Sequence, residues 1–451
     1  MWNHYSNSSR PRAVLYLILA CAALLMSAAR AHAVPAFAVQ TGQPCQMCHV
    51  GGFGPQLTPY GRNFKLSGYT QRGGSLNVPI SVMAVASYVR SQDDQPAAPA
   101  PSFKTNDNVA LDQVSLFLAG GLGSHLGGFV QTTYDGVAKA WAWDNMDLRA
   151  VTTANVKGAN VVLGASLNNS PGVQDPWNTL PAWGFPYTDS SLAPSPAAAP
   201  LLSGALAQGV LGLTGYAWIN SEIYLEAGAY GSPSASTLTH LGADPFSPGD
   251  IDGLAPYARV ALQKNFGGGT LEIGVFGMQA GIFPGRDRSA GASDTYRDLG
   301  VDFSYQAPLA NGDLLSFNGR YINERQTLDA SVPLGLAANR RNDLHDIRAD
   351  VSYYWRNTIG LTVQAFDTTG SADPLLYADN RTFKPDSSGV TLQIDGTPFG
   401  GRPQPQRRVN LRVGVQFTAY GRFNGARRNF DEAGSSAAGQ NTVRVFTWLA
   451  F

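Results

Sequence analysis

The chain ends with the stretch Val443-Arg444-Val445-Phe446-Thr447-Trp448-Leu449-Ala450-Phe451, which alternates between two kinds of position. Every second residue shares one face of an extended chain, because successive side chains of a strand point to opposite sides. The face that ends on the terminal aromatic residue carries Val443, Val445, Thr447, Leu449 and Phe451. This stretch therefore predicts a strand whose two faces meet different surroundings.

The same period of two recurs from about Val78 onward, in runs of roughly ten residues. The clearest runs set Leu299, Val301, Phe303 and Tyr305 opposite Asp298, Asp302, Ser304 and Gln306; Leu315, Phe317 and Tyr321 opposite Ser316, Asn318 and Arg320; and Val409, Leu411, Val413, Val415 and Phe417 opposite Arg408, Asn410, Arg412 and Gln416. One face suits lipid and the other suits water, as in transmembrane barrel strands. A soluble β-sandwich also alternates and is the competing interpretation.

The connections between these runs alternate in length, which favours a barrel, because bacterial barrels keep short turns in the periplasm and long loops outside. Short links fall near 120–124, 154–158, 220–221, 265–269, 309–312 and 356–357, and long ones near 91–107, 168–206, 232–253, 282–295, 326–341, 369–387 and 421–440. Two links depart from this rule. The link 135–140 is short where a long outer loop is due, and the link 395–407 is long where a short turn is due. We predict an all-β, transmembrane antiparallel β-barrel of about 16 strands over 77–451, with both ends in the periplasm.

Aromatic residues gather near the ends of the runs, where interfacial girdles of a membrane barrel would lie. They are Tyr88, Tyr134, Trp141, Trp218, Tyr257, Tyr353 and Trp355. Their positions predict contact with the lipid headgroups.

The first residues predict export. Arg10 and Arg12 precede an apolar run, and Ala31-His32-Ala33 has the small-x-small form of a signal-peptidase site, so 1–33 is expected to be a signal peptide. A lipobox ending in Cys21 is the alternative.

The overall charge argues against nucleic acid as a partner. The net charge is zero, charged residues make up 14% of the chain, and the sequence has no dense basic cluster.

The motif Cys45-Gln46-Met47-Cys48-His49 has the C-x-x-C-H pattern of covalent haem c attachment. Two thiols at this spacing can add to the two vinyl groups of one porphyrin, and the adjacent His49 becomes the proximal iron ligand. A redox dithiol or a disulfide are the alternatives, but neither explains the histidine. The sequence predicts one covalent haem c on Cys45, Cys48 and His49.

The haem-binding head is expected to span 34–76, with one short helix near 60–66, and to plug the periplasmic mouth of the barrel. For the distal iron ligand, His125 is the first candidate, as a lumen-facing residue beginning the third strand, and Met83 on the first strand is the second. Met146, His240, Met278 and His345 are the remaining candidates, and of these Met278 and His345 look less favourable. Arg62 and Lys65 could pair with haem propionates or equally with lumen carboxylates such as Asp302 or Asp350.

Residues 40–49 (QTGQPCQMCH), 57–70 (LTPYGRNFKLSGYT) and 168–187 resemble the fused outer-membrane monohaem cytochrome-porin family, whose best-known members are iron oxidases. The resemblance covers essentially the whole mature chain. It implies a single-haem head that plugs a porin of about sixteen strands and passes electrons from ferrous iron or another extracellular reductant to periplasmic cytochromes. Cys45 and Cys48 match the thioether positions and His49 the proximal ligand, whereas the segment 50–54 is longer than in the family.

We therefore expect an electron conduit in the outer membrane of a Gram-negative bacterium, in contact with lipid, with its haem and termini on the periplasmic side. Its activity could be of the Fe(II):cytochrome c oxidoreductase type. The alternative is a porin or transport channel in which the haem head is a structural plug or a redox gate. A soluble periplasmic cytochrome with a β-sandwich is a third possibility. No group of residues identifies an iron site, since Asp93, Asp94, Asp244 and Asp250 are scattered over presumed loops.

Overall fold

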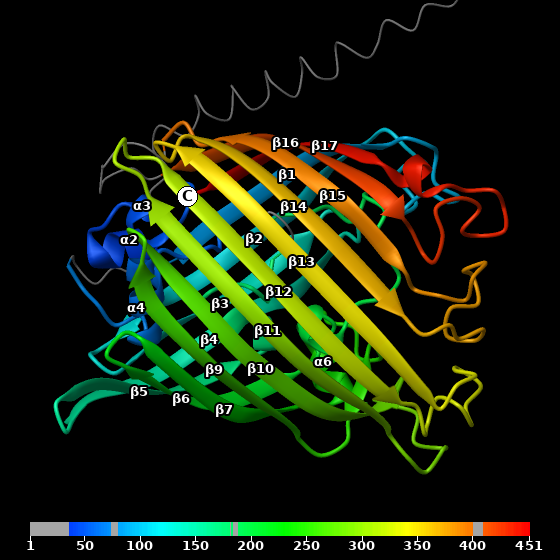
Figure 1. Ribbon diagram of the computed structural model, residues 1–451, viewed down its shortest axis with the longest axis horizontal. Coiled ribbons are helices and arrows are strands. Elements are labelled where there is room, and N and C mark those ends of the chain that lie inside the picture. Colours follow the sequence, from blue (N-terminus) through cyan, green and yellow to red (C-terminus); the bar gives the residue numbers. More distant parts are fainter. Residues whose placement is uncertain (1–35, 74–79, 181, 184–187, 400–408) are drawn as a thin grey trace, which may run out of the picture.

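A closed antiparallel β-barrel dominates the computed structural model, which describes residues 36–73, 80–180, 182–183, 188–399 and 409–451 (Figure 1). The signal-peptide prediction lies outside these described residues. The strands are β1 (Ile80–Ser91), β2 (Asn108–Leu122), β3 (Leu126–Asp135), β4 (Ala140–Val156), β5 (Ala159–Asn168), β6 (Leu211–Ile219), β7 (Ile223–Gly231), β8 (Gly249–Ile251), β9 (Ala255–Phe266), β10 (Gly269–Pro284), β11 (Asp294–Pro308), β12 (Leu314–Thr327), β13 (Arg341–Trp355), β14 (Ile359–Gly370), β15 (Ser387–Gly396), β16 (Asn410–Arg422) and β17 (Thr442–Ala450).

The barrel closes through β1, which pairs antiparallel with β2 on one side and with β17 on the other. Val85 shows both pairings, since it lies opposite Gln113 in β2 and Trp448 in β17. The described residues form a 17-stranded sheet in which β8 has only 3 residues, so sixteen long strands make up the wall. The prediction of an all-β barrel of about sixteen strands is confirmed.

The alternation read from the sequence separates the outside of the barrel from its lumen. On β11, Leu299 is 61% exposed on the outer surface, whereas its neighbour Asp298 is 5% exposed inside. The runs on β12 and β16 divide in the same way. The girdle prediction is wrong for Trp218 and Tyr257, which are both 2% exposed and face inward, because a position near a strand end fixes depth but not the face.

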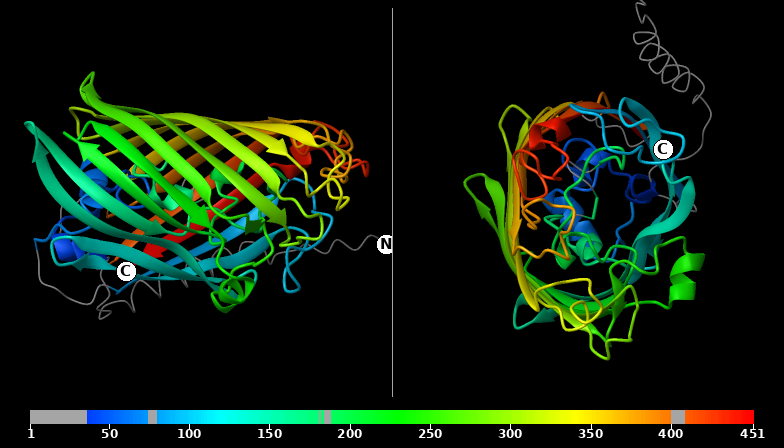
Figure 2. Two further views of the ribbon diagram at one scale, coloured as in Figure 1. Left: turned by 90° about the horizontal axis from the view of Figure 1, so that it is seen from below. Right: turned by 90° about the vertical axis from the view of Figure 1, so that its right-hand side faces the viewer.

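Short turns gather at one end of the barrel and long loops at the other (Figures 1 and 2). Asn220 and Ser221 have φ of 53° and 58°, and Arg356 and Asn357 have φ of 49° and 54°. Each pair forms the centre of a tight turn with positive φ at both positions, which is common in hairpins. The link between β3 and β4 is short although it lies at the long-loop end, as predicted. The long link 395–407 falls partly outside the described residues.

Two segments occupy the lumen, and Figure 2 shows chain inside the barrel wall. The head, here 36–73, lies in the short-turn end with helices α2 (Ala36–Thr41), α3 (Cys45–Cys48) and α4 (Pro59–Leu66). The inner loop, here the described residues 169–180, 182–183 and 188–210, lies between β5 and β6 and contains α5 (Pro171–Gln174) and the 3-10 helix η2 (Leu201–Ser203). The remaining helices are α6 (Ala235–His240) and η3 (Ala437–Gln440). None of the helices in the described residues is long and apolar enough to cross a membrane.

Ion pairs on the inner wall fix these two segments. Arg259 lies 2.5 Å from Asp302, 3.2 Å from Glu272 and 3.6 Å from Asp175 of the inner loop. Arg412 lies 3.3 Å from Asp395 and donates to the carbonyl oxygen of Gly51 in the head at 2.9 Å. Buried charges are tolerated when they are paired and hydrogen-bonded, so the polar inner face both solvates these groups and holds the plug.

Candidate functional site

The attachment motif forms a single helical turn, α3, that is clamped against α4. Pro44 precedes this turn in an extended conformation, and His49 donates its backbone N–H to the carbonyl of Cys45 at 2.9 Å. Thr58 caps α4 by accepting from the N–H of Gly61 at 3.2 Å, and its own N–H donates to the carbonyl of Cys48 at 2.9 Å. A Cβ at Gly61 would collide with the Cys48 carbonyl oxygen. Glycine is therefore required for this close approach of two backbones.

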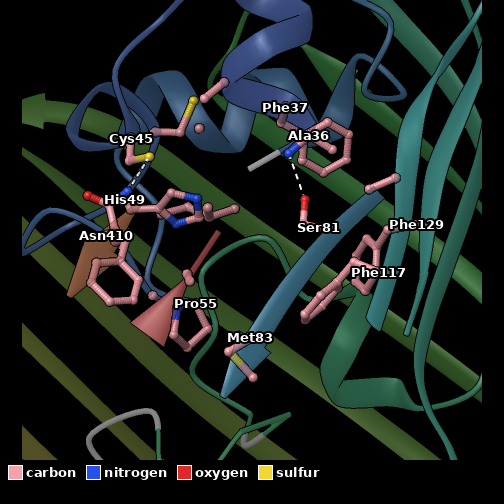
Figure 3. Close-up of a pocket in the computed structure, with 18 of the residues that line it drawn as sticks. Ala36, Phe37, Cys45, His49, Pro55, Ser81, Met83, Phe117, Phe129 and Asn410 are labelled. Atoms are coloured by element: carbon pink, nitrogen blue, oxygen red, sulfur yellow. Dashed lines mark hydrogen bonds between the residues drawn. The ribbon is translucent and has the colours of Figure 1, made fainter. Parts of the chain in front are cut away.

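Cys45, Cys48 and His49 all line one cavity of about 260 Å³ at the short-turn end, here called the attachment cavity (Figure 3). Most of its other walls are apolar, and they come from the head and from strands at both ends of the chain. They include Ala36, Phe37, Phe53, Phe64, Met83, Phe117, Phe129, Trp448 and Phe451. Aromatic and aliphatic walls with a few polar groups are typical of a cofactor pocket.

Both thiols are free and protonated at neutral pH. Burial raises the pKa of Cys48 to about 12, with the charge of Cys45 adding to the shift. Burial also raises the pKa of Cys45, although the side chain of Asn410 opposes this by donating to Cys45 Sγ at 3.0 Å. A protonated thiol pair in an apolar pocket is poorly suited to thiolate chemistry, since the thiolate is the reactive form.

His49 is half-buried, with its ring opening on the attachment cavity and withdrawn from bulk water. Burial lowers the pKa of its imidazole to about 4, with the nearby carbonyl of Gly54 opposing and the charge of Arg412 adding to the shift. The ring is therefore neutral at physiological pH, which is the form that binds a metal. Its Nδ1 atom is buried without a hydrogen-bond partner among the described residues.

These residues fit a covalent haem c. Two free thiols one helical turn apart, a neutral imidazole directly after them and an apolar cavity beside all three supply the donor set of such a group. The indole Nε1 of Trp448, in the cavity wall, is likewise buried without a partner among the described residues. The pocket thus combines apolar walls with two buried polar atoms, His49 Nδ1 and Trp448 Nε1, that have no hydrogen-bond partner among the described residues.

The structure separates the two candidates for the distal ligand. Met83 on β1 is 6% exposed and lines the attachment cavity (Figure 3). His125 was expected to face the lumen, but it lies in the turn between β2 and β3, is exposed, and has its Nδ1 3.0 Å from the carbonyl of Val151. That placement is a correction, and its reason is that the turn continues through His125, so strand alternation begins only at Leu126.

The other candidates also lie away from this cavity. His345 is on the outer face, where its ring stacks on Tyr321 with centroids 6.2 Å apart. Met278 belongs to a buried cluster with Tyr257 and Phe276, and His240 is exposed on α6. Among the candidates for the distal ligand, Met83 is the one that shares the described lining of this cavity with Cys45, Cys48 and His49.

Arg62 and Lys65 both lie on α4 and are buried in the lumen. Arg62 donates to the carbonyl of Leu57 at 3.1 Å, and burial lowers its pKa to about 10. Lys65 donates to the carbonyl of Val173 at 2.5 Å, and its Nζ lies 3.7 Å from Asp147. The predicted ion pair with a lumen carboxylate is thus present for Lys65, with Asp147 as its partner. The two carboxylates named as examples are occupied differently, since Arg259 pairs with Asp302 and Asn318 donates to Asp350.

Sequence reasoning did not single out Asn410, Trp448, Phe117 or Asp147 as neighbours of the head. Strand alternation places each of these side chains on the inner face, and that signal was available. It could not select them from the many other inward residues, because the depth at which the head rests is set by tertiary packing.

Comparison with known proteins gives structural neighbours only. No family model and no curated protein matches this sequence. The solved structures that are similar include the outer-membrane channel DcaP of Acinetobacter baumannii, with 11% identity, a TM-score of 0.45 and coverage of 82% of this chain and 96% of that chain. The anion-selective porin from Comamonas acidovorans has 10% identity, a TM-score of 0.44 and coverage of 82% of this chain and 98% of that chain. OprB of Pseudomonas putida has 11% identity, a TM-score of 0.45 and coverage of 82% of this chain and 93% of that chain.

Proposed function

We propose that this barrel is an outer-membrane haem c protein that carries electrons from an extracellular reductant to a periplasmic cytochrome. The observation that carries the proposal is that Cys45, Cys48 and His49 open together on one apolar cavity at the short-turn mouth of a closed barrel. Cys45 and Cys48 would hold the haem through thioether bonds, His49 would ligate the iron, and Met83 is the candidate for a second iron ligand. The bound haem c supplies a one-electron couple.

The exterior of the barrel supports a membrane location. A closed sheet satisfies every backbone group internally, which is what a lipid environment demands, and the outward residues of β11, such as Leu299, Val301 and Phe303, are apolar. Bacterial barrels place their short turns in the periplasm. With that orientation, the head and the carboxyl-terminal end of β17 lie on the periplasmic side, where an electron-accepting cytochrome can approach.

The head and the inner loop support a conduit, since they pack the lumen between the attachment cavity and the long-loop end. Trp177, Leu180 and Leu202 of the inner loop are at most 2% exposed. Tight packing around these side chains opposes the free passage of solutes, as a conduit that does not leak requires. The resemblance of residues 40–49 and 57–70 to the cytochrome-porins adds support, and it makes ferrous iron a candidate donor in an Fe(II):cytochrome c oxidoreductase activity.

A channel with a haem plug is the second candidate. The observation that favours it is the porin-like architecture itself, with a polar inner face and cavities in the long-loop half of the barrel. In that case the head would gate or seal the lumen at the other end.

Sealed vesicles containing the haem-loaded, full-length chain test the two functions together. A membrane-impermeant reductant is added outside, while a soluble cytochrome c and a small dye are trapped inside. Reduction of the trapped cytochrome c without escape of the dye is the result expected of a conduit. Dye escape with no cytochrome reduction would contradict the conduit and leave the channel. A variant with both Cys45→Ala and Cys48→Ala controls for electron leakage through lipid.

A further inference from the structure

A second cavity, of about 300 Å³, lies in the long-loop half of the lumen. It is bounded by residues 189–199 of the inner loop and by the inner faces of β13, β14, β15, β16 and β17. We call it the outer cavity. Its strand residues Thr368, Thr391, Thr418 and Thr442 stand near the strand ends that lead into the long loops. None of its described lining residues lines the attachment cavity.

Arg348 gives the outer cavity a cation with unused hydrogen-bonding capacity. Its neighbour across the strand pair is Arg320, which donates to Asp346 at 2.9 Å, to the carbonyl of Thr179 and to Ser203. Arg348 makes no hydrogen bond within the described residues, and its Nε lies 3.5 Å from the same Asp346. Like charges directly opposite each other in a sheet are unfavourable. Because Arg320 and Arg348 share the single carboxylate of Asp346, a further anion beside Arg348 would be favourable.

Gln364 is the second unpartnered group. It is 6% exposed, lines the outer cavity, and makes no hydrogen bond within the described residues. It faces the cavity beside Thr391, its register partner on β15, whose hydroxyl lies 3.0 Å from that of Thr418. The Gln364 amide atoms are not among the buried polar atoms that lack a partner, so they open on the water of the cavity. A ligand can replace that water at the amide if it makes the same hydrogen bonds. A ligand with hydroxyl groups would satisfy it.

Two aromatic rings complete the wall. Phe366 and Tyr420 meet edge to face with centroids 5.7 Å apart, and the Tyr420 hydroxyl donates to the carbonyl of Pro194 at 3.0 Å. That bond fixes the ring against the inner loop. Water reaches the cavity, since the side chain of Arg348 is 34% exposed and Asp189 is exposed. Asp189 places one carboxylate in the same cavity, on the side of Arg444.

From these groups we infer that the outer cavity is a binding site for a small organic carboxylate that carries hydroxyl groups. Arg348 pairs with the ligand carboxylate, because a guanidinium matches a carboxylate with two parallel hydrogen bonds. Gln364 and the threonine hydroxyls bind the ligand hydroxyls, and the rings of Phe366 and Tyr420 cover its carbon skeleton. This inference does not depend on the haem and applies to a conduit or a channel.

Calorimetric titration of the full-length chain in detergent tests the site with three probes. Gluconate carries the carboxylate and the hydroxyls, glucose carries only the hydroxyls, and propionate carries only the carboxylate. We expect gluconate to bind, and glucose and propionate to bind at least about tenfold more weakly, since each lacks one set of hydrogen bonds. Absence of gluconate binding, or equal binding of all three probes, would overturn the inference.

Variants assign the binding to this cavity. Arg348→Gln should weaken gluconate binding about tenfold or more and leave the weak binding of glucose unchanged, because glucose has no carboxylate. Gln364→Leu, which keeps a similar volume, should weaken both. Arg341→Gln changes an exposed arginine of the same strand and is the matched control. Unchanged gluconate affinity in Arg348→Gln, in a variant that keeps the wild-type heat-modified migration, would refute the site.

Discussion

Asn410 on β16 donates a hydrogen bond from its Nδ2 to the Sγ atom of Cys45 at 3.0 Å, although 365 residues separate the two in the chain. The first attachment cysteine is thus tied to a strand next to the barrel closure. Completing the barrel and positioning the head are therefore linked, because the wall that holds Cys45 exists only when β16 and β17 have paired.

Replacing the two attachment cysteines should remove the haem without removing the barrel. Cys45→Ala with Cys48→Ala leaves no sulfur to form a thioether, so no haem stain should survive on a denaturing gel. Met47→Ala is the matched control, since Met47 is 43% exposed and should keep full staining. Haem staining that persists in the double variant would show that the motif is not the attachment site.

Met83 and His125 give opposite expectations for the distal ligand. Met83→Leu keeps the volume of the cavity wall but removes the sulfur, so the charge-transfer absorption of methionine-ligated ferric haem should disappear. His125→Ala should leave the spectrum unchanged, because His125 is exposed in a turn. A spectrum that changes in His125→Ala and not in Met83→Leu would reverse this assignment.

Gly61→Ala should loosen the attachment motif. Its Cβ would meet the backbone oxygen of Cys48, and backbone cannot yield as a flexible side chain can. Overpacking of this kind costs about 1–3 kcal/mol, so we expect less covalent haem per barrel and faster proteolysis of the head. Gly215→Ala is the control, because a Cβ there has only the Gly164 carbonyl oxygen at 3.9 Å; equal haem content in the two variants would contradict the expectation.

The stability of the docked head should rise with pH between about 8 and 10.5. Burial lowers the pKa of Lys65 from 10.5 to about 8, with Asp147 opposing the shift and Arg149 adding to it. The unfolded chain therefore binds more protons than the folded chain in this interval, and the penalty of holding a buried ammonium fades as pH rises. The gain is at most about 3 kcal/mol.

Lys65→Met tests this dependence. Denaturant titrations of both proteins, followed by tryptophan fluorescence, should show a pH-dependent difference in unfolding free energy that grows from pH 8 to 10.5 in favour of the wild type. The difference should be flat below pH 7, where Lys65 is protonated in both states. A constant difference across the whole range would show that the pKa of Lys65 is not lowered.

The sequence by itself determined the barrel wall and raised the expectation of a haem c on its head. Alternation along β11, β12 and β16 fixed which side chains face lipid, because a strand has only two faces and its turns are marked by short polar links. The spacing of Cys45, Cys48 and His49 fixed the expected cofactor, since local covalent geometry leaves few uses for that pattern.

Only the tertiary structure decided which inward residues surround the head. Met83, Asn410 and Trp448 come from strands at opposite ends of the chain and meet Cys45 because the barrel closes β1 on β17. Alternation gave no way to choose Met83 over His125, since one residue more or less in a turn reverses the direction of a side chain. The lumen contacts of Lys65 with Val173 and Asp147 likewise depend on how deeply α4 inserts, which packing sets and no local pattern records.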